Sequence, residues 1–302
     1  MTTAGDAAGQ AVQAVQAVQA VQAVQAVQAV QAVQAVQERR PCVLVFAGAD
    51  PSGGAGVYAD VQAIAAVGAH ALPVVTVLTV QDNNRVHAIY PVPAEQIREQ
   101  ARALMATMTI DAVKIGIVGS RANAACIAEL LAELALLNPG LPIVLDPVLA
   151  SGHGDALTRE DAVEVVAPLL EHATLVTPNL PEAVALCPGV NEIAKQAALL
   201  IARGAPNVLI KGGHGAQDEV VNRWFAADGA TRDWHWPRSP GSFHGSGCTL
   251  ASAIAGLLAQ GRNMVEAIDG GQRFTQQALE QAFSIGPGQR IPQRAGFPSS
   301  KY

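Results

Sequence analysis

Residues 43–60 read VLVFAGADPSGGAGVYAD, and this stretch decides the fold. Its first seven residues are apolar or small and predict a strand buried on both faces, because such a strand needs no polar alternation. The strand runs into a glycine-rich turn, and glycine lets the backbone approach a ligand closely. Because the turn is neither a Walker A loop nor a Gly-x-Gly-x-x-Gly loop, it predicts a binding turn outside those two nucleotide-binding patterns.

Apolar runs alternate with helical patterns through most of the following chain. We predict strands at 72–80, 112–118, 142–146, 174–177 and 207–211, and helices at 57–67, 94–108, 122–137, 161–170, 181–186, 192–203, 247–258 and 264–283. Residues 220–225 and 232–236 flank Asp228-Gly229 and predict a hairpin. The alternation predicts an α/β fold with a central, mostly parallel sheet and helices on both faces. Ligands of such sheets bind beyond the carboxyl ends of the strands.

Composition sets the domain boundaries and excludes several classes of protein. The chain has 302 residues and a net charge of -6, and residues 11–37 are nine copies of Ala-Val-Gln. A period of three drifts around a helix and gives no fixed apolar face, so we predict a low-complexity tail over 1–40 that is disordered or transiently helical. The remaining chain predicts one domain over 41–285 and a flexible tail over 286–302. The absence of a basic run argues against nucleic acid or a membrane as partner. Four widely spaced cysteines argue against a zinc site or a disulfide framework and favour the cytoplasm.

Polar residues follow the predicted strands, where a ligand would bind. Gln81 can give and accept a hydrogen bond at the edge of a heteroaromatic ring, or it is an ordinary loop residue. Asn179 and Glu182 are three residues apart, so they can order waters around Mg²⁺ or simply cap a helix. Lys211 follows an apolar strand and is a natural counter-charge for phosphate.

Residues 244–249, HGSGCT, open an apolar helix. Successive N–H groups at a helix start form an anion hole, and the helix dipole there lowers the pKa of a thiol. We therefore expect Cys248 to be a thiolate beside a developing anion. The other cysteines are candidates for inert packing: Cys42, Cys126 and Cys187.

Taken in this order, the motifs AGADPSGGAGVYAD, VKIGIV, VLDPVLASGHGDAL, VTPNLPEA, LIKGGH and HGSGCT resemble the hydroxymethylpyrimidine/phosphomethylpyrimidine kinases of thiamine biosynthesis. The resemblance spans residues 43–282. It implies a three-layer ribokinase-like fold and a transferase that uses ATP and Mg²⁺. Its small-molecule substrates would be 4-amino-5-hydroxymethyl-2-methylpyrimidine and the monophosphate of this pyrimidine, which is converted to the diphosphate. Ribokinase-like proteins are often homodimers, so the resemblance also allows a homodimer.

The resemblance also implies a set of site residues. Cys248 stands where most ribokinase relatives carry an Asp as catalytic base, and the N–H groups of Gly245, Ser246 and Gly247 would meet the transferring phosphoryl oxygens. The residues expected at the pyrimidine are Gly48, Asp60, Gln81, Ile117 and Val148. The residues expected at ATP are Lys211, Asn179 and Asp146, and Glu182 and Asn179 would hold Mg²⁺ through water.

Two other functions remain open at this point. A pyridoxine/pyridoxal kinase of the same branch also carries the Cys, so the ring pocket must decide between the two activities. A non-catalytic pyrimidine-binding sensor would have lost Lys211 or the glycine-rich anion hole, and neither is lost. Residues 151–155 form either a lid over the phosphates or a surface loop, and His214 and His244 are candidate pocket walls.

Overall fold

The computed structural model describes residues 21–22, 25, 39–215 and 218–295. The chain divides into two units, Met1–Arg40 and Pro41–Tyr302. The predicted disordered tail over 1–40 lies almost entirely outside the described residues, so its conformation stays a prediction.

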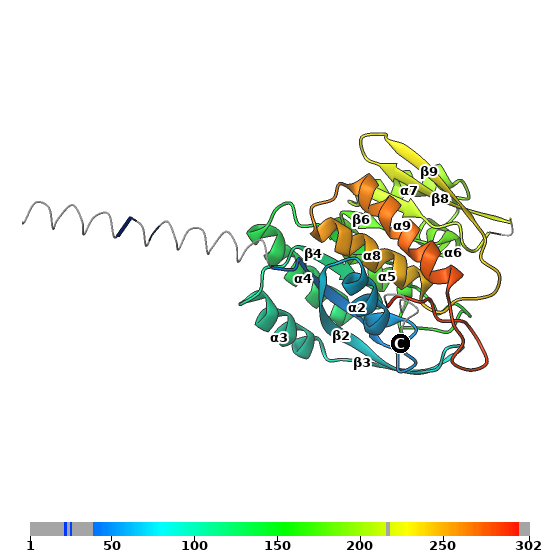
Figure 1. Cartoon of the computed structure of the whole chain (residues 1–302), viewed down its shortest axis with the longest axis horizontal. Coiled ribbons are helices and arrows are strands. Elements are labelled where there is room, and N and C mark those ends of the chain that lie inside the picture. The colour runs from blue at the N-terminus through cyan, green and yellow to red at the C-terminus, as the bar shows by residue number, and fades with distance from the viewer. Residues whose placement is uncertain (1–20, 23–24, 26–38, 216–217, 296–302) are drawn as a thin grey trace, which may run out of the picture. The chain divides into compact units, whose positions relative to one another are not determined.

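Within the described residues, nine strands form one sheet in the order β3-β2-β1-β4-β5-β6-β7-β8-β9 (Figure 1). The pairings from β2 through β7 are parallel, whereas β2–β3, β7–β8 and β8–β9 are antiparallel. The strands are β1 (Cys42–Ala49), β2 (His70–Gln81), β3 (Val86–Pro91), β4 (Ala112–Ile115), β5 (Ile143–Leu145), β6 (Leu175–Val176), β7 (Asn207–Ile210), β8 (Glu219–Ala226) and β9 (Thr231–Pro237).

Helices cover both faces of the sheet, as the alternating side chains of β1 show. Leu44 and Phe46 pack into a core with α3 (Ala94–Met105), α4 (Arg121–Leu137), α5 (Ala162–Val166), the 3-10 helix η1 (Ala167–His172), α6 (Leu180–Leu186) and α7 (Ile193–Ala202). Val43 and Val45 pack on the other face with α2 (Gly56–Ala66), α8 (Ser246–Ala259) and α9 (Met264–Glu280). The predicted three-layer α/β fold with a mostly parallel sheet is confirmed.

Two differences from the sequence prediction concern whole segments. Residues 86–91 form the edge strand β3, which we did not predict. The expected flexible tail from residue 286 is wrong for residues 289–294, because Ile291 pairs with Phe283 and Arg294 is only 1% exposed. Polar anchoring explains the second difference, since Arg294 donates hydrogen bonds to residues of two other segments.

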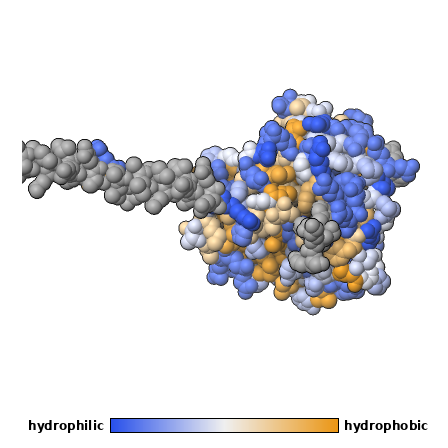
Figure 2. Space-filling view, in the orientation of Figure 1, coloured by the Kyte–Doolittle hydropathy of each residue, from blue (hydrophilic) through white to orange (hydrophobic). Residues whose placement is uncertain are grey.

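The surface of the described part is mixed in character. Figure 2 shows hydrophobic residues interspersed with hydrophilic ones on the face turned to the viewer. Among the described residues, no helix has the length and apolar character that crossing a membrane requires.

Candidate active site

A cleft of about 530 Å³ opens where the parallel strands end. Its walls include the turns after β1, β5 and β7 and the start of α8, which is the position predicted from the sheet topology. The structure therefore brings together these predicted site residues: Gly48, Gln81, Ile117, Asp146, Val148, Asn179, Glu182, Lys211, Gly245, Ser246, Gly247 and Cys248. Asp60 is the predicted site residue that does not line the cleft.

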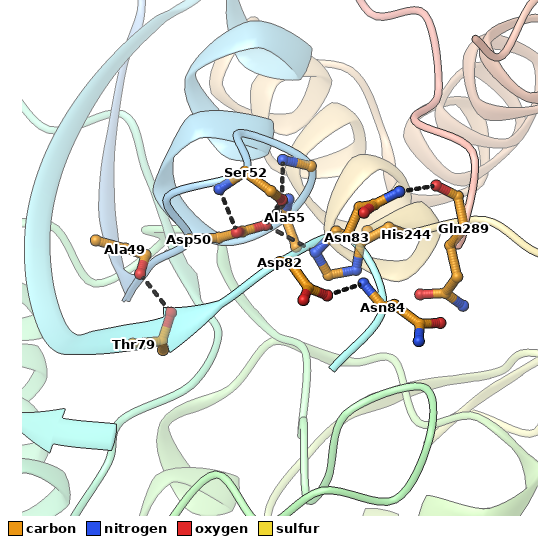
Figure 3. A network of polar contacts seen from close by, with 12 residues as sticks. Ala49, Asp50, Ser52, Ala55, Thr79, Asp82, Asn83, Asn84, His244 and Gln289 are labelled. Carbon is orange, nitrogen blue, oxygen red and sulfur yellow. Dashed lines mark hydrogen bonds and ion pairs between the residues drawn. The ribbon is translucent and has the colours of Figure 1, made fainter. Parts of the chain in front are cut away.

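The glycine-rich turn after β1 is organised by Asp50, a residue that the sequence analysis passed over (Figure 3). Its carboxylate accepts hydrogen bonds from the N–H groups of Ser52 and Ala55, each at 2.8 Å, and His244 Nε2 lies 2.7 Å from Oδ2. Burial would raise the pKa of Asp50, but the contacts with His244 and Ser52 outweigh it and hold the pKa below its ordinary value. Asp followed by Pro-Ser-Gly is a known turn pattern, so a signal for this role was present.

The start of α8 rests against that turn. Gly245 has φ +77°, and a Cβ placed on it would lie 2.1 Å from the carbonyl oxygen of Gly54. Only glycine fits this position, because both the left-handed backbone and the close approach exclude a side chain. The adjoining Ser246 and Gly247 line the cleft, where the first N–H groups of the helix have no intrahelical acceptor.

Arg294 links two glycine turns, the one after β1 that contains Gly54 and the one before α8 that contains Gly245. Its Nε donates to Thr249 Oγ1 at 2.7 Å, and one terminal nitrogen donates to the Gly54 carbonyl at 2.6 Å and more weakly to that of Gly245 at 3.3 Å. Among the described residues, no carboxylate lies within 4.0 Å of this guanidinium, and its Nη1 has no hydrogen-bond partner. Burial lowers the pKa of Arg294 to about 10, so the group remains a cation at neutral pH.

Cys248 lies at the starts of two helices. It is the third residue of α8, and the N–H of Gly56, the first residue of α2, favours negative charge on its sulfur. Burial nevertheless raises the pKa of the Cys248 thiol, and this outweighs the opposing effects of Lys114 and of the Gly56 N–H. The expectation of a lowered thiol pKa is therefore wrong, because desolvation of the buried sulfur is the larger effect.

Asp60 does not reach the cleft and is a correction to the predicted pyrimidine site. Its side chain is fully buried, both of its oxygens lie 2.9 Å from Lys114 Nζ, and Ser252 Oγ donates to Oδ1 at 2.7 Å. Burial would lower the pKa of Lys114, but Asp60 raises it well above its ordinary value. The reason for the placement is helical periodicity, because Asp60 shares a face of α2 with the buried Ala63 and Ile64.

Lys211 lines the cleft as part of an ion pair. Its Nζ lies 2.6 Å from Asp146 Oδ1, which also accepts a hydrogen bond from Thr177 at 3.1 Å. A Cβ on Gly247 would lie 3.3 Å from Lys211 Nζ. The ammonium group therefore stands beside the first turn of α8, where an anion bound to the helix start would meet it.

Asn179 and Glu182 form a capping box at the start of α6. The Glu182 N–H donates to Asn179 Oδ1 at 2.9 Å, and the Asn179 N–H donates to Glu182 Oε2 at 2.8 Å. Both residues also line the cleft, and burial raises the pKa of Glu182 to about 7 against the opposing effect of Lys211. The capping alternative is thus correct for the fold, and the same two residues also form part of the cleft wall.

Two loops that close around the cleft were only partly anticipated. Arg85 binds both oxygens of Asp155, with Nε at 3.0 and 3.1 Å, and thereby ties residues 151–155 to the segment after β2. Asn83 exchanges hydrogen bonds with the backbone of Gln289, as Figure 3 shows for its side chain. The partners are about 70 and about 200 residues apart in the chain, so no local pattern predicts them.

The fold and the cleft suit an enzyme that acts on a small molecule, and the comparisons with known proteins define its class. The family model for phosphomethylpyrimidine kinase matches residues 50–293. The chain is 38% identical over 258 residues to hydroxymethylpyrimidine/phosphomethylpyrimidine kinase of Streptomyces coelicolor, covering 82% of this chain and 92% of that protein. It is 34% identical over 261 residues to the protein of the same name in Escherichia coli, covering 84% and 96%. The chain belongs to the phosphomethylpyrimidine kinase family and is a phosphotransferase.

Solved structures show the same architecture. Pyridoxal kinase of Staphylococcus aureus in complex with AMP-PCP matches with a TM-score of 0.76 at 25% identity, covering 87% of this chain and 96% of that one. Phosphomethylpyrimidine kinase of Clostridium difficile matches with a TM-score of 0.68 at 29% identity, covering 80% and 100%. Members of two related activities therefore share this fold.

Proposed function

We propose that this protein transfers the γ-phosphoryl group of ATP to the hydroxymethyl group of 4-amino-5-hydroxymethyl-2-methylpyrimidine, and then phosphorylates the monophosphate to the diphosphate in thiamine biosynthesis. One observation carries the proposal: Cys248 at the start of α8 shares a cleft with Gln81 and with an apolar pair suited to a flat ring, Ile117 and Val148.

The ring end of the cleft suits an aminopyrimidine. Gly48 leaves room beside Ile117, since a Cβ on Gly48 would lie 3.8 Å from Ile117 Cδ1. Gln81, at the end of β2, offers both a donor and an acceptor, which match a ring nitrogen and an adjacent amino group. With Asp60 held by Lys114, Gln81 is the polar residue we assign to recognition of the ring.

The other end of the cleft suits ATP. Gln272 lines it, and the Gln272 Oε1 accepts hydrogen bonds from Asn222 and Trp236, which fixes the orientation of the amide. Its Nε2 is buried without a hydrogen-bond partner among the described residues, so it is a donor that an acceptor of the nucleotide can satisfy. Lys211 and the N–H groups of residues 245–247 would meet the phosphates.

The donor set suits Mg²⁺ bound through water rather than directly. No group of three or more His, Cys, Asp or Glu side chains is gathered for a metal in the described part of the chain. Mg²⁺ keeps several of its waters and often needs one or two protein carboxylates besides phosphate oxygens. Glu182 and Asn179 would orient such waters, and the ion would neutralise charge on the phosphates.

The residues then divide the reaction between them. The hydroxymethyl oxygen forms a bond to the γ-phosphorus, the bond from that phosphorus to the bridging oxygen breaks, and ADP leaves with the electron pair. The proton of the hydroxyl group passes to Cys248 in its thiolate form, which becomes a neutral thiol. The N–H groups of Gly245, Ser246 and Gly247 hold the transferring oxygens. Because this route needs a reduced thiol, we also propose the cytoplasm as the location, and the four cysteines form no disulfide.

A pyridoxal kinase is the second candidate, favoured by the likeness to the Staphylococcus aureus structure. Steady-state kcat/KM for the hydroxymethylpyrimidine and for pyridoxal, measured with ATP and Mg²⁺, distinguishes the two. We expect the pyrimidine to be preferred. A preference for pyridoxal of more than about tenfold, equal to about 1.4 kcal/mol, overturns the proposal. Full ATP-dependent turnover by Cys248→Ala overturns the assignment of the base.

A further inference from the structure

A buried ion pair lies one helical turn below the sulfur of Cys248. Cys248 and Ser252 are four residues apart on α8 and so project from the same face. Ser252 donates a hydrogen bond to Asp60 at 2.7 Å, and Lys114 lies 2.9 Å from both oxygens of Asp60. Three elements, α2, β4 and α8, thus contribute one charged or polar side chain each beneath the catalytic cysteine.

Stability is a poor reason for this pair. Lys114 and Asp60 are both fully buried, and removing two charges from water costs more than an average ion pair returns. Apolar residues of similar volume often serve as well or better at such positions. Lys114 also stands between Val113 and Ile115 in a strand whose other residues are all apolar. The pair is therefore a candidate for a role in the chemistry next to it.

Five charged groups face Cys248 from the surrounding elements. They are Lys114 on β4, Asp60 on α2, Asp146 after β5, Lys211 after β7 and Arg294 from the C-terminal segment. Each of the three cations also has a partner of its own, because Lys114 pairs with Asp60, Lys211 pairs with Asp146 and Arg294 donates to the two glycine turns.

Lys114 lies behind the wall of the cleft rather than on it. Its ammonium group carries three N–H bonds, and in the described part of the chain two of them go to Asp60. A Cβ on Gly116 would lie 2.8 Å from Lys114 Nζ, so the charge stands against the end of β4, where Ile117 lines the cleft. A cation at that place favours negative charge on the neighbouring sulfur.

We propose that Lys114, held in place by Asp60 and Ser252, is a positioning residue that stabilises the thiolate form of Cys248. It acts through the sulfur and does not touch substrate. Its value for the reaction rests on the proposed function, in which Cys248 is the base, but its effect on the thiol does not require turnover.

The test is the alkylation of Cys248 by iodoacetamide across a range of pH, followed by mass spectrometry of the peptide that contains Cys248. The full-length protein is used without substrate, and the Cys42 peptide of the same sample is the internal reference. Lys114→Met should slow alkylation at a fixed mildly alkaline pH by about tenfold, which corresponds to one pKa unit. Asp60→Asn should accelerate it, because the carboxylate that opposes the Lys114 charge is gone.

The opposite signs separate an electrostatic role from a structural one, since general loosening of the core would expose the sulfur and accelerate alkylation in both variants. The neutral double variant Asp60→Asn with Lys114→Met should alkylate at a rate between those of the single variants. Lys195→Met, an exposed lysine remote from the cleft, is the matched control and should leave the rate unchanged.

An unchanged or faster rate in Lys114→Met, or an unchanged or slower rate in Asp60→Asn, overturns the proposal. If Lys114→Met does not fold, Lys114→Gln takes its place, and the same opposite signs relative to Asp60→Asn are required. Failure of the proposed function gives a different result. Full turnover by Cys248→Ala would show that Cys248 is not the base, but it would not change the alkylation rates measured for the Lys114 and Asp60 variants.

Discussion

Replacement of Arg294 by Met tests whether the C-terminal segment organises the active site. The change removes a guanidinium that is 1% exposed and that donates to Thr249 at 2.7 Å and to the Gly54 carbonyl at 2.6 Å. Methionine is similar in length and fills much of the same space, so the experiment removes the donors and the charge more than the packing.

The expected size of the effect follows from the contacts. A hydrogen bond that involves a charged group contributes about 1.5–3 kcal/mol, so the two short bonds together contribute about 3–6 kcal/mol. Keeping the buried group charged works against this by about 3 kcal/mol, since burial lowers the pKa of Arg294 from 12.5 to about 10. The acceptors left without donors cost about 1–3 kcal/mol each. Together these figures give a net loss of about 2–9 kcal/mol in the free energy of unfolding.

Thermal melting and steady-state kinetics read out the two consequences. For a domain of this size the melting temperature should fall by about 2–4 °C per kcal/mol. The value of kcat should fall about 100-fold, because the N–H groups of residues 245–247 lose their alignment, while KM for the pyrimidine changes little. Arg294→Lys keeps the charge and one donor and should fall between the two proteins. If Arg294→Met melts within about 1 °C of the parent and turns over at the same rate, Arg294 does not organise the site.

Three further changes test other parts of the cleft. Asp50→Asn should destabilise the protein at neutral pH. Because the pKa of Asp50 lies below its ordinary value of 3.8, this loss of stability should shrink as the pH falls below 3.8. A difference in melting temperature that stays constant with pH would contradict this. Arg85→Ala should raise KM by about two- to fivefold, the size expected for an exposed pair, and adding Asp155→Ala should cost nothing more; additive effects would show that the two act separately. Gly245→Ala places a methyl group 2.1 Å from a backbone oxygen and should abolish turnover. Gly229→Ala is the control, because Gly229 also has a positive φ but a methyl group there would have no atom within 4 Å, and it should keep turnover. Equal losses of turnover in the two variants would show that backbone strain alone is responsible.

Most strands of the sheet could be predicted because each combines an apolar run with a polar end. The run 43–49 gave β1, and the same pattern located β4, β5 and β7. β3 escaped prediction because only Ile89 is buried in it, which is typical of a short edge strand with one face and one edge in solvent.

The site was predictable where function depends on residues next to a strand end or a helix start. Gln81, Lys211 and Cys248 all line the cleft because parallel strands end on one side of the sheet. Arg294 could not be predicted, since its partners Gly54 and Thr249 are remote in the chain and no periodicity connects them.

For Asp60, the sequence contained a signal for burial in an ion pair, but the family resemblance was given more weight. Its spacing from Ala63 and Ile64 puts it on the buried face of α2, and Lys114 in an apolar strand requires a carboxylate partner. These two observations together predict the ion pair. The family resemblance pointed to the ring instead, because Asp60 ends a motif of which Gly48 and Gly56 do line the cleft.

The charges around the start of α8 would allow an acidic chain to bind the anion that we propose for this place. Lys114 is neutralised by Asp60 and Lys211 by Asp146, so these two pairs add no net charge. Arg294 has no carboxylate partner within 4.0 Å among the described residues, and it stands directly behind the two glycine turns. One buried cation and the N–H groups of a helix start therefore supply the positive potential locally. A net charge of -6 spread over the chain does not cancel it, because charges beyond about 10 Å are largely screened at the surface.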